Sequence, residues 1–549
     1  MPNESNRRDF LKTIGFGIAS LAMPGCTAAA KRFAGETSAD RPNIVLIMAD
    51  DMGYSDLGCY GGEIQTPNLD RLAAGGIRFT QFYNTARCCP TRASLMTGLY
   101  PHQTGMGWMT AADLGYPGYS GDLNNKCVTI AEVLKQAGYS TYITGKWHLT
   151  YDGYQDGPKH NWPCQRGFDR FYGTIAGSGS YFKPDKLTKN NTRIYAPDEG
   201  HYYTDAISNY AADFITEHDQ LNGDKPFFLY VAYTCPHWPL HAKQKDIEKY
   251  KGKYLKGWDV LRAERHKRML KMGIVDKAWP ITPRDENVQA WDNIEPAERK
   301  LWDLRMAVYA AQIDCMDQGI GRTISALEKT GKLNNTLIMF LSDNGGCAED
   351  ITRGKEELEL LGTDDSFESY RSPWANVSNT PFRLYKKSVH EGGIATPLII
   401  HWPRRIKACG ELHHQPGHVI DIMPTCLEIA GATYPRKYKG KRIIPLEGKS
   451  LVPAFDNKAI EREAIYFEHE ANRAIRVGKW KLVAKGIDGP WELYDLEADR
   501  TELNDLAQKF PERTKKMAVM WQGWAKRTNV LPLDDRGWTE RLQADKKKR

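Results

Sequence analysis

The sequence predicts an α/β fold in which a large, mostly parallel sheet lies between layers of helices. Strands with unbroken apolar runs recur along the chain, and such runs are typical of strands that are covered on both faces. Segments with helical patterning lie between these strands, which favours right-handed crossovers and a parallel sheet. From about residue 465 the pattern changes to short alternating strands and a final helix. That change predicts a small antiparallel subdomain packed on the main one.

The predicted elements begin after Arg41. The first strand, Asn43–Ala49, ends at two acidic residues, Asp50 and Asp51. The other strands of the main sheet are predicted at Ser140–Thr144, Pro226–Tyr233, Thr336–Leu341 and Pro397–Trp402. Helices are predicted at Asn68–Ala74, Thr129–Ala137, Tyr203–Glu217, Glu298–Lys329 and Val419–Ala430. The subdomain is predicted from strands Ile465–Glu468, Ala474–Val477 and Trp480–Val483 and a helix near Pro511–Ala525.

Two segments interrupt this alternation. Residues 243–295 are charged and rich in tryptophan, with a helix predicted near Val260–Met272. Residues 347–380 are polar and rich in turn-forming residues, which predicts a long loop beside the functional site.

The N-terminus has the features of an export signal. Arg7 and Arg8 precede an apolar run, Thr13–Gly25, that is too short to span a bilayer as a helix. The arrangement resembles a twin-arginine signal, which is read by the twin-arginine export machinery. The alternative is a buried amphipathic helix, and lipid attachment at Cys26 stays open. We therefore expect an exported protein, periplasmic or extracellular, with residues 1–30 as signal, 41–460 as catalytic domain, 461–530 as C-terminal subdomain and 531–549 as a basic tail.

Composition narrows the functional classes. The 549 residues are 41% hydrophobic and 26% charged, which excludes a disordered, collagen-like or coiled-coil chain. The net charge of +7 is small for this length, and four of these charges lie in the tail Lys546–Arg549. This is not the charge pattern of a nucleic-acid-binding protein. The eleven cysteines are scattered, without the paired spacing of a zinc site.

Polar or ionisable residues follow four of the predicted strands. They are Asp50 and Asp51, Lys146 and His148, His237, and Asp343 with Asn344. In open α/β sheets ligands bind at the carboxyl ends of the strands. Each group alone could be a helix cap or a turn, but four such strand ends together predict a site. Three carboxylates and an amide oxygen suit Ca²⁺ or Mg²⁺, and Lys146 beside His148 suits an anionic group and a proton transfer.

A cysteine motif gives the most specific indication. Cys88-Cys89-Pro90-Thr91-Arg92 precedes a helix-forming run, which places Cys88 near a helix N-terminus. Backbone N–H groups there favour a bound anion or an ionised nucleophile. Arg92 lies one turn further along the same helical face and can neutralise that charge.

These motifs resemble those of the type I sulfatases, in the alkaline-phosphatase-like superfamily. Cys88-x-Pro90-x-Arg92 followed by Thr97-Gly98 resembles the family signature, and Ala49-Asp50-Asp51-Met52-Gly53 resembles its first metal motif. Later blocks match in order: Thr66–Asp70, Gly145–His148, Pro236–Pro239, Ser342–Gly345, Arg383–Lys386, Glu391–Ile394, Gly478–Leu482 and Glu492–Leu496. The resemblance covers about Arg41 to Trp524, and Glu391–Pro397 together with Glu468–Glu470 and Asn472–Arg473 resembles an arylsulfatase-like bacterial branch.

The resemblance implies a sulfuric ester hydrolase of the alkaline-phosphatase-like fold. In that family the signature cysteine is oxidised to formylglycine by a formylglycine-generating or maturase enzyme, and Cys88 holds the required offsets from Pro90 and Arg92. One Ca²⁺ would be bound by Asp50, Asp51, residue 88, Asp343 and Asn344. A hydroxyl of the hydrated aldehyde would attack sulfur with Asp343 as proton acceptor, and His148 would then help to expel sulfate. Arg92 and Lys146 would hold residue 88 and the sulfate oxygens, and His237 and Lys386 would serve the leaving alcohol.

Several alternatives stay open in the sequence. Lys387 stands where many relatives have glycine, so Lys386 and Lys387 compete for the leaving-group role, and the spacing to Glu391 favours Lys386. The predicted substrate is a sulfated sugar or an aryl sulfate ester. Phe367, Tyr370 and Trp374 either line a sugar-binding cleft or pack the loop that carries them. The alternatives to a sulfatase are a phosphate or phosphonate ester hydrolase of the same superfamily and a non-catalytic relative that binds sulfated glycans.

Overall fold

The fold is known from a computed structural model that describes residues 40–152, 157–197, 199–354, 356–407 and 409–546. The expected export signal and Cys26 lie outside these residues. In the described part of the chain, no helix is both long and apolar enough to cross a membrane. The described cysteines are all free thiols.

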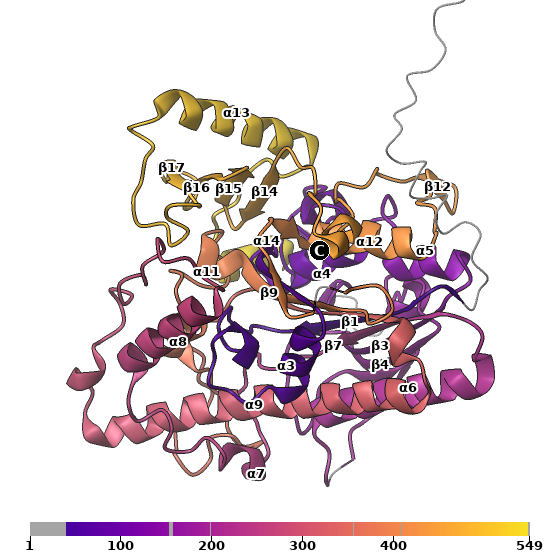
Figure 1. The fold of residues 1–549 in the computed structure, drawn as a ribbon, viewed down its shortest axis with the longest axis horizontal. Coiled ribbons are helices and arrows are strands. Elements are labelled where there is room, and N and C mark those ends of the chain that lie inside the picture. Colours follow the sequence, from indigo (N-terminus) through magenta and orange to yellow (C-terminus); the bar gives the residue numbers. More distant parts are fainter. Residues whose placement is uncertain (1–39, 153–156, 198, 355, 408, 547–549) are drawn as a thin grey trace, which may run out of the picture.

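A sheet of eleven strands forms the centre of the molecule (Figure 1). Its strand order is β10-β2-β9-β8-β1-β7-β3-β4-β5-β6, with β11 also paired to β2. The central pairs β8–β1, β1–β7 and β7–β3 are parallel, while β9 runs antiparallel to both of its neighbours. The strands are β1 (Asn43–Ala49), β2 (Ile77–Tyr83), β3 (Ser140–Lys146), β4 (Arg170–Thr174), β5 (Leu187–Lys189), β6 (Thr192–Arg193), β7 (Phe227–Ala232), β8 (Thr336–Ser342), β9 (Ala395–His401), β10 (Glu411–His413) and β11 (Gly417–His418).

Helices cover both faces of this sheet, as the apolar strands predict. Successive side chains of β1 enter two different cores: Val45 and Ile47 pack in one, Leu46 and Met48 in the other. The first core is closed by α3 (Pro67–Ala74), α6 (Tyr203–Asn222) and α9 (Pro296–Lys329). The second is closed by α4 (Cys88–Thr97), α5 (Ile130–Gln136) and α12 (Ile422–Ile429). Figure 1 shows the two layers on opposite sides of the sheet.

A second, four-stranded antiparallel sheet lies at one end of the molecule (Figure 1). It consists of β14 (Ile465–His469), β15 (Asn472–Val477), β16 (Trp480–Ala484) and β17 (Glu492–Asp495), covered by α13 (Pro511–Arg527). Glu391 of the main fold joins the two parts, because its buried carboxylate accepts from Lys481 and Arg500, each at 2.9 Å. The remaining elements are α7 (Gln244–Ile247), α8 (Trp258–Met272), α10 (Arg371–Ser378), α11 (Glu391–Ile394), β12 (Lys437–Tyr438), β13 (Lys441–Arg442) and α14 (Trp538–Lys546).

The predicted α/β class is confirmed, with its mostly parallel sheet and its antiparallel C-terminal sheet. The sequence patterns did not reveal β2, whose apolar run is broken by Arg78 and Gln81, or β17 and α10. The last stretch, 531–549, was expected to be a basic tail, but its described part contains α14. Residues 538–546 dock on the main fold through Asp545 and Arg541, and composition alone does not reveal such contacts.

Candidate active site

The predicted strand ends meet at one edge of the sheet. The strands β8, β1, β7 and β3 are neighbours and run parallel, so their carboxyl ends lie together. Ala49 is paired with Ser342, which places Asp50 beside Asp343 one residue later. His237 follows β7, and Lys146 is the last residue of β3. Sheet topology therefore gathers side chains that are far apart in the sequence.

Three carboxylates and three cations pair at this edge. Lys146 Nζ donates to Asp50 Oδ2 at 2.5 Å. Arg92 Nη2 donates to Asp343 Oδ2 at 2.9 Å and lies 3.5 Å from Asp50 Oδ2. Lys386 Nζ donates to Asp51 Oδ2 at 2.8 Å. All six residues are buried, so each charge depends on its partner for stabilisation.

The pairing shifts the pKa of two of these carboxyl groups in opposite directions. Burial raises the pKa of Asp50, but Lys146, His237 and Arg92 together lower it to about 2. The pKa of Asp343 is raised well above its usual value by burial and by the negative charge of Asp50, which outweigh Arg92. The pKa values of Asp50 and Asp343 are thus shifted in opposite directions, although both carboxyl groups lie beside Arg92.

Two buried oxygen atoms of the same cluster have no hydrogen-bond partner among the described residues. They are Asp50 Oδ1 and Asn344 Oδ1. Asn344 donates through Nδ2 to Asp51 Oδ1 at 2.7 Å, so its amide oxygen is the atom left over. A buried oxygen without a partner is costly, and carboxylate and amide oxygens are the ligands of hard divalent cations. The residues present therefore fit such an ion.

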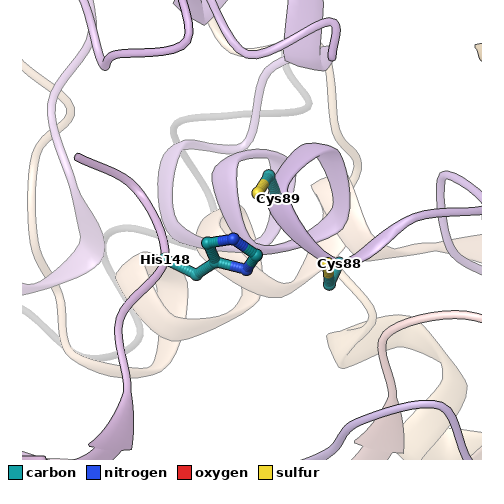
Figure 2. A group of neighbouring side chains, drawn as sticks. All are labelled: Cys88, Cys89 and His148. Atoms are coloured by element: carbon teal, nitrogen blue, oxygen red, sulfur yellow. The ribbon is translucent and has the colours of Figure 1, made fainter. Parts of the chain in front are cut away.

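Cys88 is the first residue of α4, as predicted, and it lines a cavity of about 610 Å³. A hydrogen bond from Cys89, together with Lys146 and His148, lowers the pKa of the Cys88 thiol well below its usual value against the opposing effect of burial. Figure 2 shows the two cysteine side chains leaving the helix in different directions, with the His148 ring close to both. The Cys89 thiol does not line the cavity, and burial raises its pKa.

His148 follows β3 with a positive φ of 55° and also lines the cavity. Its ring packs against Gly177, where an added Cβ would lie 2.5 Å from ring atoms. His148 Nδ1 is buried without a partner among the described residues. The ligand atoms of Cys88, Cys89 and His148 lie within 4.8 Å of one another, and sulfur and nitrogen donors of this kind favour a softer metal than the aspartate cluster does.

His237 and Lys386 form the opposite side of the cluster. His237 Nδ1 lies 2.6 Å from the carbonyl oxygen of Trp238, so Nδ1 donates and Nε2 faces Lys386 Nζ at 3.4 Å. Burial lowers the pKa of His237. Lys387 also lines the cavity, but its side chain is 40% exposed and its ammonium group pairs with Glu349 at 2.9 Å. The geometry places Lys386, rather than Lys387, beside Asp51 and His237.

Other cavity residues were not found from the sequence. Arg87 and Glu349 form an ion pair of 3.3 Å, and Trp238 Nε1 donates to the same carboxylate at 3.1 Å. Trp538, from the expected tail, also lines the cavity. Trp238 lies in the Pro236–Pro239 block and Glu349 in the loop predicted beside the site, whereas no local signal marks Arg87 or Trp538.

The aromatic residues expected from the 347–380 loop do not line the cavity. Tyr370 and Trp374 are 3% and 0% exposed and belong to the core, where Tyr370 stacks on Tyr309. Phe367 is half-buried and contacts Trp238 with a ring separation of 5.8 Å. For Tyr370 and Trp374 loop packing is therefore the correct alternative.

Comparisons with known proteins agree with one another. The sulfatase family profile matches residues 42–432, and the profile of the C-terminal part of N-sulphoglucosamine sulphohydrolase matches 382–525. An arylsulfatase of Klebsiella aerogenes is 34% identical over 75% of this chain and 91% of its own length. An N-acetylglucosamine-6-O-sulfatase of Bacteroides thetaiotaomicron is 28% identical over 92% of this chain and 89% of its own. The crystal structure of Ps i-CgsB in complex with k-i-k-neocarrahexaose is similar with a TM-score of 0.67 and 28% identity, covering 92% of this chain and 98% of that one.

Proposed function

The chain belongs to the sulfatase family of the alkaline-phosphatase-like superfamily and is a sulfuric ester hydrolase; from that premise we propose that its nucleophile arises from Cys88 by oxidation to formylglycine. One observation carries the proposal. Among the described residues, Cys88 is the only cysteine that lines the cavity, and it does so at a helix N-terminus in a cavity that His148 and Lys386 also line. The hydrated aldehyde would supply one hydroxyl for attack on sulfur and a second whose proton loss expels sulfate.

The divalent cation is proposed to be Ca²⁺, held by Asp50, Asp51, Asp343, Asn344 and residue 88. The unpartnered oxygens of Asp50 and Asn344 support this set. Such an ion supplies positive charge where a sulfuryl group gathers negative charge.

Different side chains serve the two steps of the reaction, which are the attack on sulfur and the release of sulfate. Asp343 lies at the strand end beside Asp50, where its carboxylate can accept the proton of the attacking hydroxyl. His148 lies close to Cys88 and has a free ring nitrogen, so it can take the proton whose loss releases sulfate. Arg92 and Lys146 hold the carboxylates in place and present positive charge to the sulfate oxygens.

The leaving alcohol needs a proton, and two groups are placed to provide it. Lys386 Nζ and His237 Nε2 are 3.4 Å apart and both residues line the cavity. Burial lowers the pKa of His237, whereas the charge of Asp51 raises the pKa of Lys386 well above its usual value against the opposing effect of burial. Lys386 is therefore the group that carries a proton at neutral pH. Lys386 therefore acts as the general acid, and His237 orients it.

The proposed substrate is a sulfated sugar or an aryl sulfate. Relatives of this chain include an N-acetylglucosamine-6-O-sulfatase and an arylsulfatase. Export through the twin-arginine machinery is part of the same proposal and rests on Arg7 and Arg8. Replacing both with lysine should leave the protein in the cytoplasm of a host that has this pathway, whereas unchanged export would refute it.

The mass of the peptide that spans residue 88 tests the nucleophile. Protein produced together with a formylglycine-generating enzyme should carry an aldehyde at residue 88 and an intact thiol at Cys89. Cys88→Ala should abolish release of sulfate, and Cys89→Ala is the matched control that should keep activity. An unmodified Cys88, while a control sulfatase is modified in the same cells, would contradict the proposal. Faster release of phosphate than of sulfate from matched esters would favour a phosphoester hydrolase.

A further inference from the structure

The end of the described chain forms part of the cavity wall. The C-terminal family profile stops at residue 525, yet α14 (Trp538–Lys546) follows it and brings Trp538 to the cavity that contains Cys88, His148 and Lys386. The segment between the profile and the helix is tied to the main fold, because Tyr119 donates to the carbonyl oxygen of Val530 at 2.6 Å.

Buried polar contacts fix α14 in this position. Asp545 is 8% exposed and accepts from Tyr151 Oη at 2.7 Å and from the backbone N–H of Asp113 at 3.0 Å. The Arg541 side chain is 2% exposed, and its guanidinium group lies 4.8 Å from the centre of the Trp108 ring. These partners come from the 108–151 region, which also supplies Met109, Ala111 and His148 to the cavity. The helix is therefore anchored to the same region that supplies part of the cavity wall.

Trp538 is held in place by packing and still offers surface to a ligand. Its ring lies 5.0 Å from the ring of Trp108, which is 1% exposed and donates through Nε1 to Glu470 at 2.9 Å. Trp538 itself is 46% exposed. Among the exposed large hydrophobic side chains of the described residues, it alone lines this cavity. Because the Trp538 indole packs on Trp108 and faces the cavity, it can bind a ring of the ligand with little further loss of its own side-chain entropy.

The polar residues of the cavity lining favour a sugar ring over an aryl ring as the ligand. Arg87, Asp152, Glu349, Asp350 and Arg353 line the same cavity as Trp538. Some of these groups already pair with protein charges, as Arg87 does with Glu349 and Asp350 with Arg371. A purely apolar aryl group would still take them out of water without adding a hydrogen bond. A pyranose has an apolar C–H face that fits an indole and hydroxyl groups at its edge that can bond to such residues.

We propose that Trp538 is a substrate-binding residue on which the pyranose ring of the leaving alcohol stacks, so that α14 forms part of the leaving-group subsite. This inference rests on the proposed sulfatase mechanism and narrows its substrate class to sulfated sugars. It assigns a role in substrate binding to a part of the chain beyond the matched family profiles.

The test compares the mature full-length wild type with Trp538→Ala and Trp538→Phe. The substrates are monosulfated glucose, galactose, N-acetylglucosamine and N-acetylgalactosamine, and inhibition by inorganic sulfate is measured in parallel. Tyr195→Ala removes an exposed aromatic ring that does not line the cavity and is the matched control. For the best sugar we expect Trp538→Ala to raise KM about tenfold, or about 1.4 kcal/mol, with kcat within twofold. The phenylalanine variant should recover most of this loss.

The sulfate measurement separates ring binding from a general structural effect. Inorganic sulfate has no ring, so its inhibition constant should stay the same in Trp538→Ala. An unchanged KM, or an equal weakening of sulfate inhibition, would overturn the inference while the sulfatase function stands. Wild-type activity on 4-nitrophenyl sulfate without activity on any of the sugars would also overturn it. Failure on every sulfate ester would instead refute the proposed function on which the inference rests.

Discussion

Replacing Lys386 with methionine should slow the reaction to a degree that depends on the leaving group. The Lys386 ammonium group lies 2.8 Å from Asp51 and 3.4 Å from His237, and only 2% of its side chain is exposed. Its loss removes the proposed proton donor and one positive charge from a buried cluster. General acid catalysis contributes about 10²- to 10⁴-fold, which is about 3–5 kcal/mol in the activation barrier. For a sugar alcohol, a poor leaving group, we expect kcat/KM to fall by this amount.

The assay compares two substrates and two neighbouring lysines. 4-Nitrophenol leaves as a stable anion and needs little protonation, so kcat/KM for its sulfate should fall about tenfold or less in Lys386→Met. Lys387→Met is the matched control, because the Lys387 side chain is 40% exposed and pairs with Glu349 away from Asp51. Equal losses on both substrates, or a larger loss in Lys387→Met, would refute the assignment of Lys386 as the acid. Melting temperatures of both variants exclude an effect of unfolding.

Three further predictions concern stability. A Ca²⁺ concentration about a hundredfold above its Kd should raise the free energy of unfolding by about 2.7 kcal/mol. For a chain of this size that corresponds to a rise of about 3 °C in Tm. An equal Tm in the presence of a chelator would contradict the metal site. Glu391→Gln should lower the free energy of unfolding by about 3–5 kcal/mol, because it removes the charged partner of buried Arg500 and one of the two carboxylates that pair with Lys481. Glu512→Gln, at an exposed position of α13, should change Tm by less than 1 °C. Burial lowers the pKa of His469 to about 4 from 6.5, so its contribution to stability is complete above pH 6.5 and is lost as the pH falls towards 4. His469 alone should account for about 2.5 kcal/mol of the stability lost between pH 7 and 4.5, in addition to the losses from other buried histidines such as His401 and His413. His469→Gln should therefore show a smaller drop in Tm over that range than the wild type, and an equal drop would contradict this assignment.

The parts of the site that sequence predicts are those fixed by sheet topology and local motifs. Asp50 and Asp343 meet because β1 and β8 are parallel neighbours in register, and the apolar runs indicate such strands. Cys88 begins α4 because the residues after it favour a helix from that point. These relations depend on backbone geometry over a few residues, so they can be seen without a structure.

The parts that sequence does not predict depend on contacts between distant segments. Trp538 reaches the cavity because Asp545 and Arg541 anchor α14 on Tyr151 and Trp108, which lie about four hundred positions earlier in the chain. Tyr370 and Trp374 have the composition of ligand-binding aromatics, but their surroundings in the fold make them core residues. Exposure and docking are tertiary properties, and neither leaves a periodic pattern in the chain.

The charge balance of the cluster supports the proposal of a bound cation at this place. When all six groups are ionised, the charges of Asp50, Asp51 and Asp343 are matched in number by those of Arg92, Lys146 and Lys386. The protein can then bury the six side chains without a net charge. This neutral arrangement attracts an anionic ester only weakly, and it leaves Asp50 Oδ1 and Asn344 Oδ1 without partners. A divalent ion bound by those oxygens would satisfy them and leave two net positive charges beside residue 88. The same residues would then favour a sulfate ester, and they would favour it more strongly as charge moves onto its oxygens in the transition state.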